Sequence, residues 1–402
     1  MKICLVHNAY ARPSGEETML HNIASLLRDH RHSVLEYLRF SANIAGTPFG
    51  RTRAFFSGIY SASAASEFAS VLRDFRPDIV QVQNVYPLIS PVVLELARQH
   101  NVPVVLRCSN YRLICPSGLL LSHGGVCEKC VPNREYWCIL RNCERNVFKS
   151  VGYALRNYAA RLRNAFANNV SLYIAQTAFQ QHKLVSAGFD PDKFVVIPNM
   201  TSVHPDPTPW SLGSYVAFSG RLAEEKGIRT LTSAARMCSD IPFQAAGAIA
   251  SPADLASLCS PNFYTQGHLG SPQLDDFYKA MRVLVLPSIW YEGFPSVILE
   301  AMLHAKPVIC SNVGGIPEIV QDGVTGLLFE PANPLDLSRK IRLLWDRPDL
   351  CRQMGQAALQ KVLREYSPSR YYDRLMAAYQ KALSTQPASQ LPAAAAPPIP
   401  DR

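Results

Sequence analysis

The sequence lacks long hydrophobic runs, and only 18% of its 402 residues are charged. No apolar stretch reaches the ~18 residues that a membrane-spanning helix needs. The opening residues Lys2-Ile3-Cys4-Leu5-Val6 predict a short strand, because a signal peptide needs a basic start and a longer apolar core. With 48% hydrophobic residues, the composition is typical of a globular protein, and we expect it in the cytoplasm.

Acidic residues are in the minority, with 31 against 40 lysine and arginine residues, so the formal net charge is +9. Such an excess suits anionic partners, but no RNA- or DNA-binding module is visible, which argues against nucleic acid. The length exceeds what one hydrophobic core usually supports, so we expect two domains of about 150 to 200 residues.

Short apolar strands alternate with helical patterns through both halves of the chain. In the first half, strands are predicted near 2–7, 33–39, 78–83, 102–107, 171–175 and 194–197, with helices near 16–29, 62–75, 90–100, 145–167 and 178–186. In the second half, strands are predicted near 215–219, 243–247, 263–266, 282–287, 307–311 and 326–329, with helices near 227–238, 272–280, 296–304, 334–346, 349–365 and 369–383. Alternation of this kind predicts an α/β fold with two parallel sheets and right-handed crossovers.

A proline-rich linker separates the two halves. The predicted organisation is an N-terminal domain over 1–198, the linker over 199–213, a C-terminal domain over 214–366, a last helix over 367–383 and a tail over 384–402. The tail is rich in proline and alanine, a composition typical of a disordered segment.

The segment Glu292-Gly293-Phe294-Pro295-Ser296-Val297-Ile298-Leu299-Glu300 carries the most functional information. It follows an apolar run that predicts a buried parallel strand, and a ligand is expected beyond the carboxyl end of that strand. Gly293 lets the backbone approach the ligand, Pro295 presets the first helical residue, and the free N–H groups of the helix that follows face an anion.

The two carboxylates of this segment, Glu292 in the loop and Glu300 on the helix, can accept hydrogen bonds from sugar hydroxyls on either side of a diphosphate. An acidic loop and a solvated acidic helix are the alternative, because this spacing alone is a weak signal.

Several ordered blocks between about 215 and 365 resemble the GT-B fold retaining glycosyltransferases of group 1, or family 4. The blocks are Ser219 to Gly227, the segment with Glu292 and Glu300, Ala301-Met302 with Lys306 to Ile309, and Gly314 to Val320 with Asp322-Gly323 and Thr325 to Leu328. The N-terminal half is similar to the same family more loosely.

This resemblance implies two Rossmann-like parallel-sheet domains facing each other across a cleft, with the last helix crossing back onto the N-terminal domain. It also implies that Glu300 holds the ribose of the nucleotide. Glu292, with the backbone near Gly293, Phe294 and Pro295, would contact the donor sugar.

Arg221 and Lys226 follow the strand near 215–219 and lie between Gly220 and Gly227, which allow tight turns. An arginine fork and a lysine point charge suit a diphosphate whose charge grows as it leaves. An ordinary surface salt bridge to a neighbouring glutamate is the alternative, and the resemblance favours the phosphate role.

In the N-terminal half, Ser14-Gly15-Glu16-Glu17 opens a helix where the resembled family has a glycine-rich turn. Only Gly15 carries over, because Glu16 takes the place of the second glycine. Weak diphosphate contact is therefore expected at Gly15. His7, Asn8 and Tyr10 line the same edge, and His7 is a candidate acceptor-site residue, although a lone histidine is more often structural.

Ser109 marks the sharpest departure from the resembled family, which has a histidine near the donor sugar directly before the run Asn110-Tyr111-Arg112. Serine can hydrogen-bond a hydroxyl, but it does not titrate near neutral pH. In a retaining reaction in which the donor phosphate takes the acceptor proton, this change could reduce activity, alter the sugar accepted or leave an inactive binder.

Eleven cysteines in a cytosolic chain are expected to be mostly reduced and buried. Five of them lie in an expected insertion over 115–143: Cys115, Cys127, Cys130, Cys138 and Cys143. Cys127 and Cys130 have the two-residue gap of a zinc knuckle, and Cys115 with Cys138 or Cys143 could complete four thiolates. A structural zinc ion and unliganded thiols are both open interpretations, and neither metal nor another cofactor is expected to serve catalysis.

The predicted helix near 145–167 has a basic stripe of Arg145, Lys149, Arg156 and Arg163. Its opposite stripe is apolar and consists of Val147, Val151, Leu155, Tyr158 and Leu162. One interpretation is a packed helix with a solvated basic side. The other is attraction of the basic side to anionic lipid, where lipid-linked acceptors reside.

Together these features predict a retaining, metal-independent glycosyltransferase of the hexosyltransferase type. It would move a sugar from a nucleotide-diphosphate donor to a cell-envelope or exopolysaccharide acceptor, lipid-linked or not, in the cytoplasm or at the inner face of the plasma membrane. A nucleotide-sugar epimerase of the same fold and a catalytically degenerate nucleotide-sugar-binding protein are the alternatives.

Overall fold

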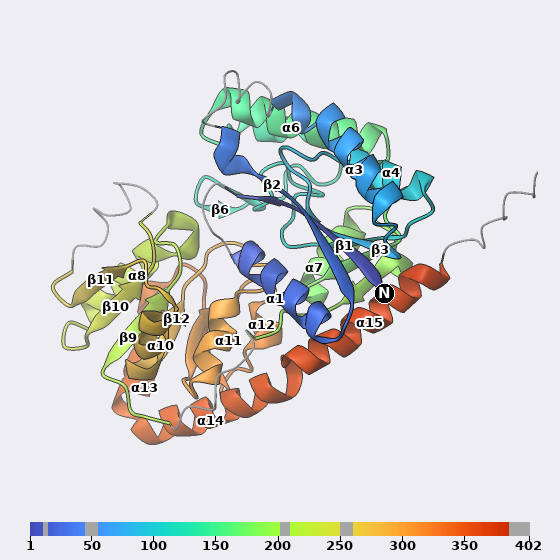
Figure 1. Ribbon diagram of the computed structural model, residues 1–402. Coiled ribbons are helices and arrows are strands. Elements are labelled where there is room, and N and C mark those ends of the chain that lie inside the picture. The colour runs from blue at the N-terminus through green and yellow to red at the C-terminus, as the bar shows by residue number, and fades with distance from the viewer. Residues whose placement is uncertain (11–14, 45–54, 202–209, 250–259, 386–402) are drawn as a thin grey trace, which may run out of the picture.

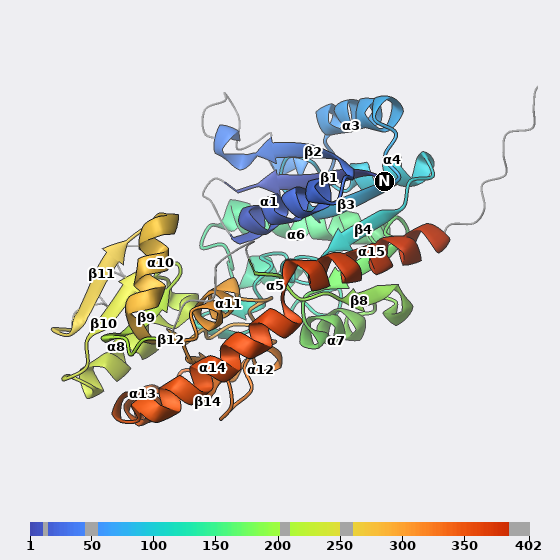
Figure 2. The same ribbon diagram turned by 60° about the horizontal axis from the view of Figure 1, so that its bottom comes forward.

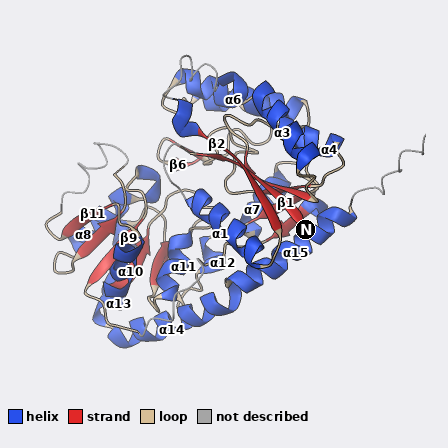
Figure 3. Ribbon diagram, viewed as in Figure 1, coloured by secondary structure: helices blue, strands red, loops and turns tan. Residues whose placement is uncertain are grey.

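The chain forms two α/β domains, and each is built on a six-stranded parallel sheet with helices packed against it (Figure 1, Figure 3). The computed structural model describes residues 1–10, 15–44, 55–201, 210–249 and 260–385. The predicted fold class, two parallel-sheet α/β domains, is confirmed. Among the described helices, none is both long and apolar enough to cross a membrane.

The N-terminal sheet consists of β1 (Lys2–Ala9), β2 (Ser33–Phe40), β3 (Ile79–Asn84), β4 (Val104–Arg107), β7 (Leu172–Ala175) and β8 (Phe194–Val196). Their order across the sheet is β2-β1-β3-β4-β7-β8. The chain therefore runs from β1 outward to β2 and returns to β3 on the other side of β1. The strand order reverses between β1 and β3.

The described helices of the N-terminal domain are α1 (Gly15–Asp29), α3 (Ala62–Asp74), α4 (Val92–Gln99), α5 (Tyr136–Leu140), α6 (Val147–Leu162) and α7 (Ala178–Ser186). Two 3-10 turns, η1 (Ser41–Ile44) and η2 (Pro191–Lys193), and an antiparallel hairpin of β5 (Leu121–Ser122) and β6 (Gly125–Val126) complete the described elements of this domain.

The C-terminal sheet consists of β9 (Tyr215–Ser219), β10 (Phe243–Ala246), β11 (Phe263–Gly267), β12 (Met281–Leu286), β13 (Val308–Ser311) and β14 (Gly326–Phe329), in the order β11-β10-β9-β12-β13-β14. The helical elements are η3 (Glu224–Lys226), α8 (Ile228–Met237), α10 (Ser271–Ala280), α11 (Ser296–Leu303), α12 (Ile316–Ile319), α13 (Pro334–Asp346), α14 (Pro348–Glu365) and α15 (Pro368–Ser384). Here the strand order reverses between β9 and β12.

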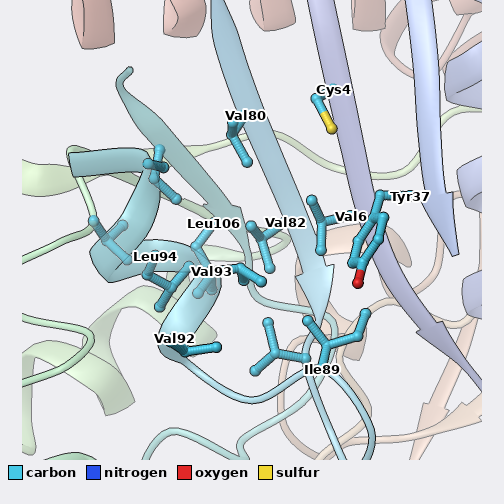
Figure 4. Close-up of a cluster of buried hydrophobic side chains, with 14 of the residues drawn as sticks. Cys4, Val6, Tyr37, Val80, Val82, Ile89, Val92, Val93, Leu94 and Leu106 are labelled. Carbon is cyan, nitrogen blue, oxygen red and sulfur yellow. The ribbon is translucent and has the colours of Figure 1, made fainter. Parts of the chain in front are cut away.

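Strand β1 shows how both faces of the N-terminal sheet are covered. Because successive side chains of a strand point to opposite faces, Cys4 and Val6 pack toward α3 and α4, whereas Ile3 and Leu5 pack with α1 and α15. Figure 4 shows the first of these cores, in which side chains of β1, β2, β3 and β4 face those of α4. Covering both faces in this way buries the central strands β3 and β4 along their whole length, including the polar residues Gln81 and Gln83 of β3.

The last helix returns to the N-terminal domain. α15 follows α14 at an angle and lies along the N-terminal sheet (Figure 2). Its residues Leu375 and Tyr379 are buried, and the Tyr379 hydroxyl donates a hydrogen bond to Gln81 of β3. Residues from the C-terminal end of the chain therefore belong to the core of the N-terminal domain.

Every predicted strand corresponds to a strand of one of the two sheets, with ends that differ by a few residues at most. Among the described elements, the strands β5 and β6, the helices α5 and α12 and the three 3-10 turns have no predicted counterpart. The predicted linker is described only at 199–201 and 210–213, and the predicted tail only as far as Thr385. The other positions of these two predictions lie outside the described residues.

One prediction is wrong: the orientation of the helix near 145–167. In the structure Arg156 of the predicted basic stripe is buried, and its guanidinium donates to the carbonyl of Pro116 at 2.9 Å. Val147, Leu155 and Leu162 of the predicted packed stripe are exposed instead. Neither predicted stripe as a whole faces inward, because Arg156 is the one member of the basic stripe that is buried and the other buried residues of α6 are small or polar.

Candidate functional site

The carboxyl ends of β9 and β12 lie side by side where the strand order of the C-terminal sheet reverses. In open α/β sheets a ligand binds in the crevice beyond such a reversal, because the loops from the two strands leave in opposite directions. The loop after β9 carries Arg221 and Lys226, and the loop after β12 carries Glu292. The structure therefore brings together residues that the sequence separates by more than one strand and helix.

Lys226 and Glu292 form an ion pair with 2.7 Å between Nζ and Oε1. The lysine side chain is 19% exposed and the glutamate side chain 6%. The Ser288 hydroxyl and the Trp290 indole N–H also donate to the same oxygen, at 2.5 and 3.0 Å. Three donors on one carboxylate oxygen hold the Glu292 side chain in one orientation.

Glycines bring the two loops close enough for this ion pair. Gly227 has φ +73°, and a Cβ atom there would lie 1.7 Å from the carbonyl oxygen of Pro287. Gly220, at the start of the same turn, has φ +138°, which other residues rarely adopt. The backbone N–H of Ile289 donates to the carbonyl of Glu225 at 3.0 Å, which ties the turn to the β12 loop.

Arg221 does not contact Glu292 in the described contacts. Its guanidinium pairs with Glu225 one helical turn away, and its side chain is 55% exposed. This is the surface salt bridge that the sequence left open as an alternative. An exposed pair of this kind contributes little stability, so Arg221 can exchange its carboxylate for another anion at low cost.

Glu300 lies on α11, behind the loop that carries Glu292. It accepts a hydrogen bond from the Tyr278 hydroxyl at 2.6 Å. Burial raises the pKa of the Glu300 carboxyl, although this hydrogen bond and nearby His304 oppose the shift. Burial also raises the pKa of Tyr278 well above its usual value, so the phenol remains a donor to Glu300.

α11 begins at Ser296, where the sequence predicts the helix near 296–304 to start. Pro295 precedes it as the N-cap with φ −74° and ψ 104°. The backbone of this turn touches the N-terminal domain. The side-chain amide of Asn199 donates to the carbonyl of Phe294 at 3.2 Å.

Gly293 is the point where the two domains approach most tightly in this loop. A Cβ atom at Gly293 would lie 2.7 Å from the side-chain oxygen of Gln176 and 3.1 Å from the backbone oxygen of Ser109. A larger residue would require the Gln176 side chain to move and the backbone at Ser109 to shift slightly. Ser109, predicted on the opposite side of the site, therefore lies directly against the Glu292 loop.

Ser109 is held by the residue two positions before it. The buried guanidinium of Arg107 donates to the Ser109 hydroxyl at 2.8 Å and to Gln83 at 3.1 Å, and it also bonds Asn199. The family histidine would stand beside this fixed positive charge. Serine is compatible with that charge because its hydroxyl accepts a hydrogen bond and carries no charge of its own.

The N-terminal edge near Gly15 is occupied by a network of side chains. Glu16, in the first turn of α1, accepts hydrogen bonds from Asn110 at 3.1 Å and from the Tyr10 hydroxyl at 3.2 Å. Arg112 donates to Tyr10 at 3.4 Å and to Asn84 at 2.9 Å. A carboxylate in this position complements the positive end of the helix dipole, the role that a ligand phosphate would take at a glycine.

His7 and Asn8 are both fully buried. The Nε2 atom of His7 lies 3.3 Å from a carboxylate oxygen of Glu17, while its buried Nδ1 has no hydrogen-bond partner among the described residues. Asn8 accepts from the backbone N–H of Leu88 and donates to Ser41. These two residues support the edge from beneath, and Tyr10 is the one that reaches the network above it.

The predicted zinc site gains no geometric support. In the part of the chain that the structure describes, no three or more histidine, cysteine, aspartate or glutamate side chains are arranged to hold a metal ion. The cysteines that belong to that part are free thiols. A hydrogen bond from Cys138 lowers the pKa of the Cys143 thiol to about 6. The zinc interpretation of the cysteine cluster stays a prediction.

Several residues of the site were missed by the sequence analysis. Ser288 and Trp290 stand four and two residues before Glu292. Their closeness to Glu292 in the sequence was the one indication that they could contact it. Glu318 of α12 accepts from the backbone N–H groups of Ala178 and Phe179, both at 2.7 Å, and so binds the start of α7 in the other domain. No short motif could reveal such a contact, because it joins two domains.

Comparisons with known proteins agree with this geometry. Residues 213–361 match the sequence model of the family described as glycosyl transferases group 1. Residues 14–200 match that of the glycosyl transferase 4-like domain. The two matches account for most of both domains.

Among curated proteins, an uncharacterized 42.6 kDa protein in the cps region of Klebsiella pneumoniae is 28% identical over 265 residues, which is 65% of this chain and 64% of that protein. The alpha-maltose-1-phosphate synthase of Mycolicibacterium smegmatis is 32% identical over 184 residues, 41% of this chain and 47% of the synthase. The matches thus span less than two thirds of the length of these relatives.

Among solved structures, sucrose-phosphate synthase from Thermosynechococcus elongatus superimposes with a TM-score of 0.70 at 16% identity, covering 96% of this chain and 100% of that one. Anabaena HepE in complex with UDP gives 0.65 at 18% identity, covering 94% and 100%. At such identities the likeness shows the fold alone, which is the GT-B fold of glycosyltransferases.

Proposed function

The chain belongs to the group 1 glycosyltransferases, and from this premise we propose that it transfers a hexosyl group from a nucleotide-diphosphate sugar, with retention at the anomeric carbon. The acceptor would be a cell-envelope or exopolysaccharide glycan, lipid-linked or free. The relative from a cps region supports an acceptor of this class.

The observation that carries the proposal is the Lys226–Glu292 pair at the strand-order reversal of the C-terminal sheet. The lysine offers a point charge to a phosphate, and the carboxylate offers an acceptor to sugar hydroxyls. In the unliganded protein each group satisfies the other. A donor that brings both a diphosphate and a sugar could replace both halves of the pair at once.

In the proposed reaction, Lys226 and Arg221 bind the diphosphate and stabilise the negative charge that grows as the sugar leaves. Gly220 and, on the other domain, Gly15 let backbone N–H groups approach the phosphates. Charge from these side chains would take the part that a metal ion plays in other transferases, so no metal is required.

On the sugar side, Glu292 and the backbone of Gly293, Phe294 and Pro295 orient the transferred hexose. Glu300 accepts hydrogen bonds from the ribose hydroxyls. Ser109, against the same loop, offers a hydroxyl to the sugar. The acceptor proton passes to the donor phosphate, as the resemblance to retaining glycosyltransferases implies.

The test is a screen of nucleotide sugars in which release of the nucleoside diphosphate is measured with and without extracted lipid acceptors. Because Anabaena HepE was solved with UDP and with UDP and glucose, uridine donors come first. Acceptor-dependent release with one donor is expected. If neither Glu292→Ala nor Lys226→Ala changes the binding or turnover of any donor, the site assignment is wrong.

A catalytically degenerate binder is the second candidate, and Ser109 with Glu16 favours it because both positions depart from the resembled family. Donor binding without transfer or hydrolysis would support it. Interconversion of the free donor without an acceptor would instead identify an epimerase.

A further inference from the structure

Helix α6 presents its apolar side to solvent. Phe148 is 83% exposed and Leu162 59%, and Val147, Leu155 and Tyr158 are exposed as well. Of the twenty large hydrophobic side chains that are exposed among the described residues, five lie on this helix of 16 residues. Exposed apolar side chains gathered on one element indicate a surface that is covered in the working state of a protein.

The side of α6 that packs against the domain consists of small and polar residues, which allows the apolar side to face solvent. Its buried residues are small or polar: Ser150, Gly152, Ala154, Arg156, Asn157 and Ala160. A Cβ atom on Gly152 would lie 2.6 Å from the ring of Phe55, so the glycine admits that ring. The Asn157 amide donates to the carbonyl of Arg112 at 2.7 Å. The helix is therefore fastened by its polar side.

The exposed apolar residues form one straight stripe. Phe148, Leu155 and Leu162 are spaced by seven residues, and Tyr158 lies between the last two, which keeps all four on one side of the helix. The segment that packs on α6 through Phe55 adds exposed Phe56 and Tyr60. We call the set Phe56, Tyr60, Val147, Phe148, Leu155, Tyr158 and Leu162 the α6 face.

Basic side chains flank the α6 face at both ends. Lys149 is exposed at the start of the helix and Arg163 at its end, and Arg145, just before the helix, is also exposed but pairs with Glu224. The nearby carboxylate of Glu135 is paired with Arg161 at 2.7 Å. An apolar strip bordered by cations matches an anionic bilayer, in which acyl chains lie beneath acidic headgroups.

We propose that the α6 face docks the protein on an anionic membrane surface, with Phe148, Leu155 and Leu162 entering the headgroup region. A second copy of the chain would leave the flanking cations facing one another, whereas acidic lipid headgroups neutralise them. The occupant of this face is therefore a bilayer.

Docking in this way orients the candidate site. Arg145, just before α6, pairs with Glu224 at 2.9 Å, and Glu224 begins the 3-10 turn that ends at Lys226. The start of α6 thus lies beside the turn that carries the phosphate-binding lysine. This last step rests on the proposed function, since it would let a lipid-linked acceptor reach the donor without leaving the membrane.

The experiment is flotation of the full chain with vesicles of phosphatidylcholine, alone or mixed with phosphatidylglycerol. We expect binding to the mixed vesicles, weakened by salt, and a loss of at least about tenfold in the variant Phe148→Ser/Leu155→Ser/Leu162→Ser. The matched control is Leu335→Ser/Leu343→Ser/Leu363→Ser, which removes leucines exposed to a similar degree on helices of the C-terminal domain. It should bind as the natural chain does.

A thermal unfolding curve and the mass in solution accompany each variant. Absence of vesicle binding by the natural chain would overturn the proposal, and so would undiminished binding by the α6 variant. A natural chain that is dimeric and becomes monomeric in the α6 variant, with no vesicle binding in either, would assign the face to self-association. Flotation needs no turnover, so it can succeed or fail independently of the glycosyltransferase assignment.

Discussion

The two sheets present their carboxyl edges to the same interface, but they prepare them differently. At the C-terminal edge the charged side chains stand in separate pairs, Lys226 with Glu292 and Arg221 with Glu225. At the N-terminal edge Glu16, Tyr10 and Arg112 belong to one continuous hydrogen-bonded network. A pair can exchange one partner for a ligand, whereas a network must be broken at several points.

The difference separates two roles. Paired charges whose partners are replaced on binding suit a site that binds and releases an anion in every cycle. A network suits a wall of fixed shape, because each member restrains the next. We therefore expect the C-terminal edge to control donor binding and turnover, and the N-terminal edge to control how well the bound sugar is placed.

The largest expected effect comes from the Lys226–Glu292 pair. Lys226→Ala should lower kcat/KM for the donor by about 100-fold or more, because the charge that meets the leaving diphosphate is lost. Steady-state release of nucleoside diphosphate measures it. Arg342→Ala is the control, since Arg342 of α13 forms an exposed ion pair with Asp240, which precedes β10 at the end of the sheet opposite to the site.

The losses of kcat/KM in the single variants Lys226→Ala and Glu292→Ala should not multiply in the double variant. In the variant Lys226→Ala/Glu292→Ala, each missing group has already lost its partner, so the combined loss should be smaller than the product of the single losses. A control variant as damaging as Lys226→Ala, or fully multiplicative losses in the double variant, would contradict the importance of the pair.

A smaller, opposite effect is expected at the N-terminal edge. Ser109→His restores the residue of the resembled family beside the Gly293 loop, and it should raise turnover by about fivefold, less than a free general acid-base group can provide. The neighbouring Arg107 disfavours a second positive charge, which limits the gain. The pH profile of turnover should acquire an inflection at or below ~6.5.

Ser109→Ala is the comparison variant for this experiment. It removes the hydroxyl that accepts from Arg107 and adds no titrating group. If Ser109→His and Ser109→Ala give the same turnover and pH profile, position 109 does not act on the donor sugar. The two edges would then differ only in how their side chains pack.

A pH effect of a few fold is expected from Glu300. Burial raises the pKa of its carboxyl, so Glu300 gains its proton at a higher pH than an ordinary glutamate does. A protonated carboxyl accepts ribose hydroxyls less well, and nucleotide affinity should fall as the pH drops through the raised pKa. Titration calorimetry across this range measures the effect, and Glu300→Gln should abolish the dependence.

Stability should depend on the same group with the opposite sign. A carboxyl whose pKa is raised by folding stabilises the fold when protonated, so its contribution is complete below the ordinary value of 4.5 and is lost as the pH rises through the raised pKa. Thermal unfolding of the Glu300→Gln variant, which has no such group, provides the reference. If nucleotide affinity and thermal stability both rose, or both fell, with pH across this range, the raised pKa of Glu300 would not be their common cause.

Removal of metal ions is expected to have no effect on turnover. Treatment with a chelator should leave turnover within about twofold, because side-chain cations serve the diphosphate in the proposed mechanism. Loss of turnover that Mg²⁺ or Mn²⁺ restores would show that the C-terminal edge works with a metal ion. Metal analysis of the same sample tests the zinc prediction for Cys115, Cys127, Cys130, Cys138 and Cys143.

Much of the fold was predictable because strand and helix patterns are local. The strand β12 is an apolar run, and a run of that kind indicates a parallel strand buried on both faces. The first turn of α1 contains Glu16 and Glu17, the acidic start that favours a helix. The short elements of the cysteine-containing insertion were missed because their turns are held by contacts with α6 and not by their own sequence pattern.

The sequence predicted which residues belong to the candidate site, but it did not predict which of their side chains pair with one another. Glycines around Lys226 and the proline turn after Glu292 are local signals. As the alternative to a phosphate role, the sequence offered a salt bridge of Arg221 or Lys226 to a neighbouring glutamate, and Arg221 forms one with Glu225. Lys226 reaches 66 residues along the chain to Glu292 because Gly227 lets one loop lie on the other.

The sequence by itself determined the architecture of two parallel sheets and named Arg221, Lys226 and Glu292, whereas the strand order that brings them together came from the structure. Hydrophobic period and turn chemistry decide these features, and both can be read within a few residues. Tertiary structure alone decided that Lys226 is held by Glu292, that Ser109 touches the Gly293 loop, and that α6 turns its apolar side outward. Each of these depends on a partner from a distant part of the chain, and the free energy of burial belongs to the pair of surfaces and not to either one alone.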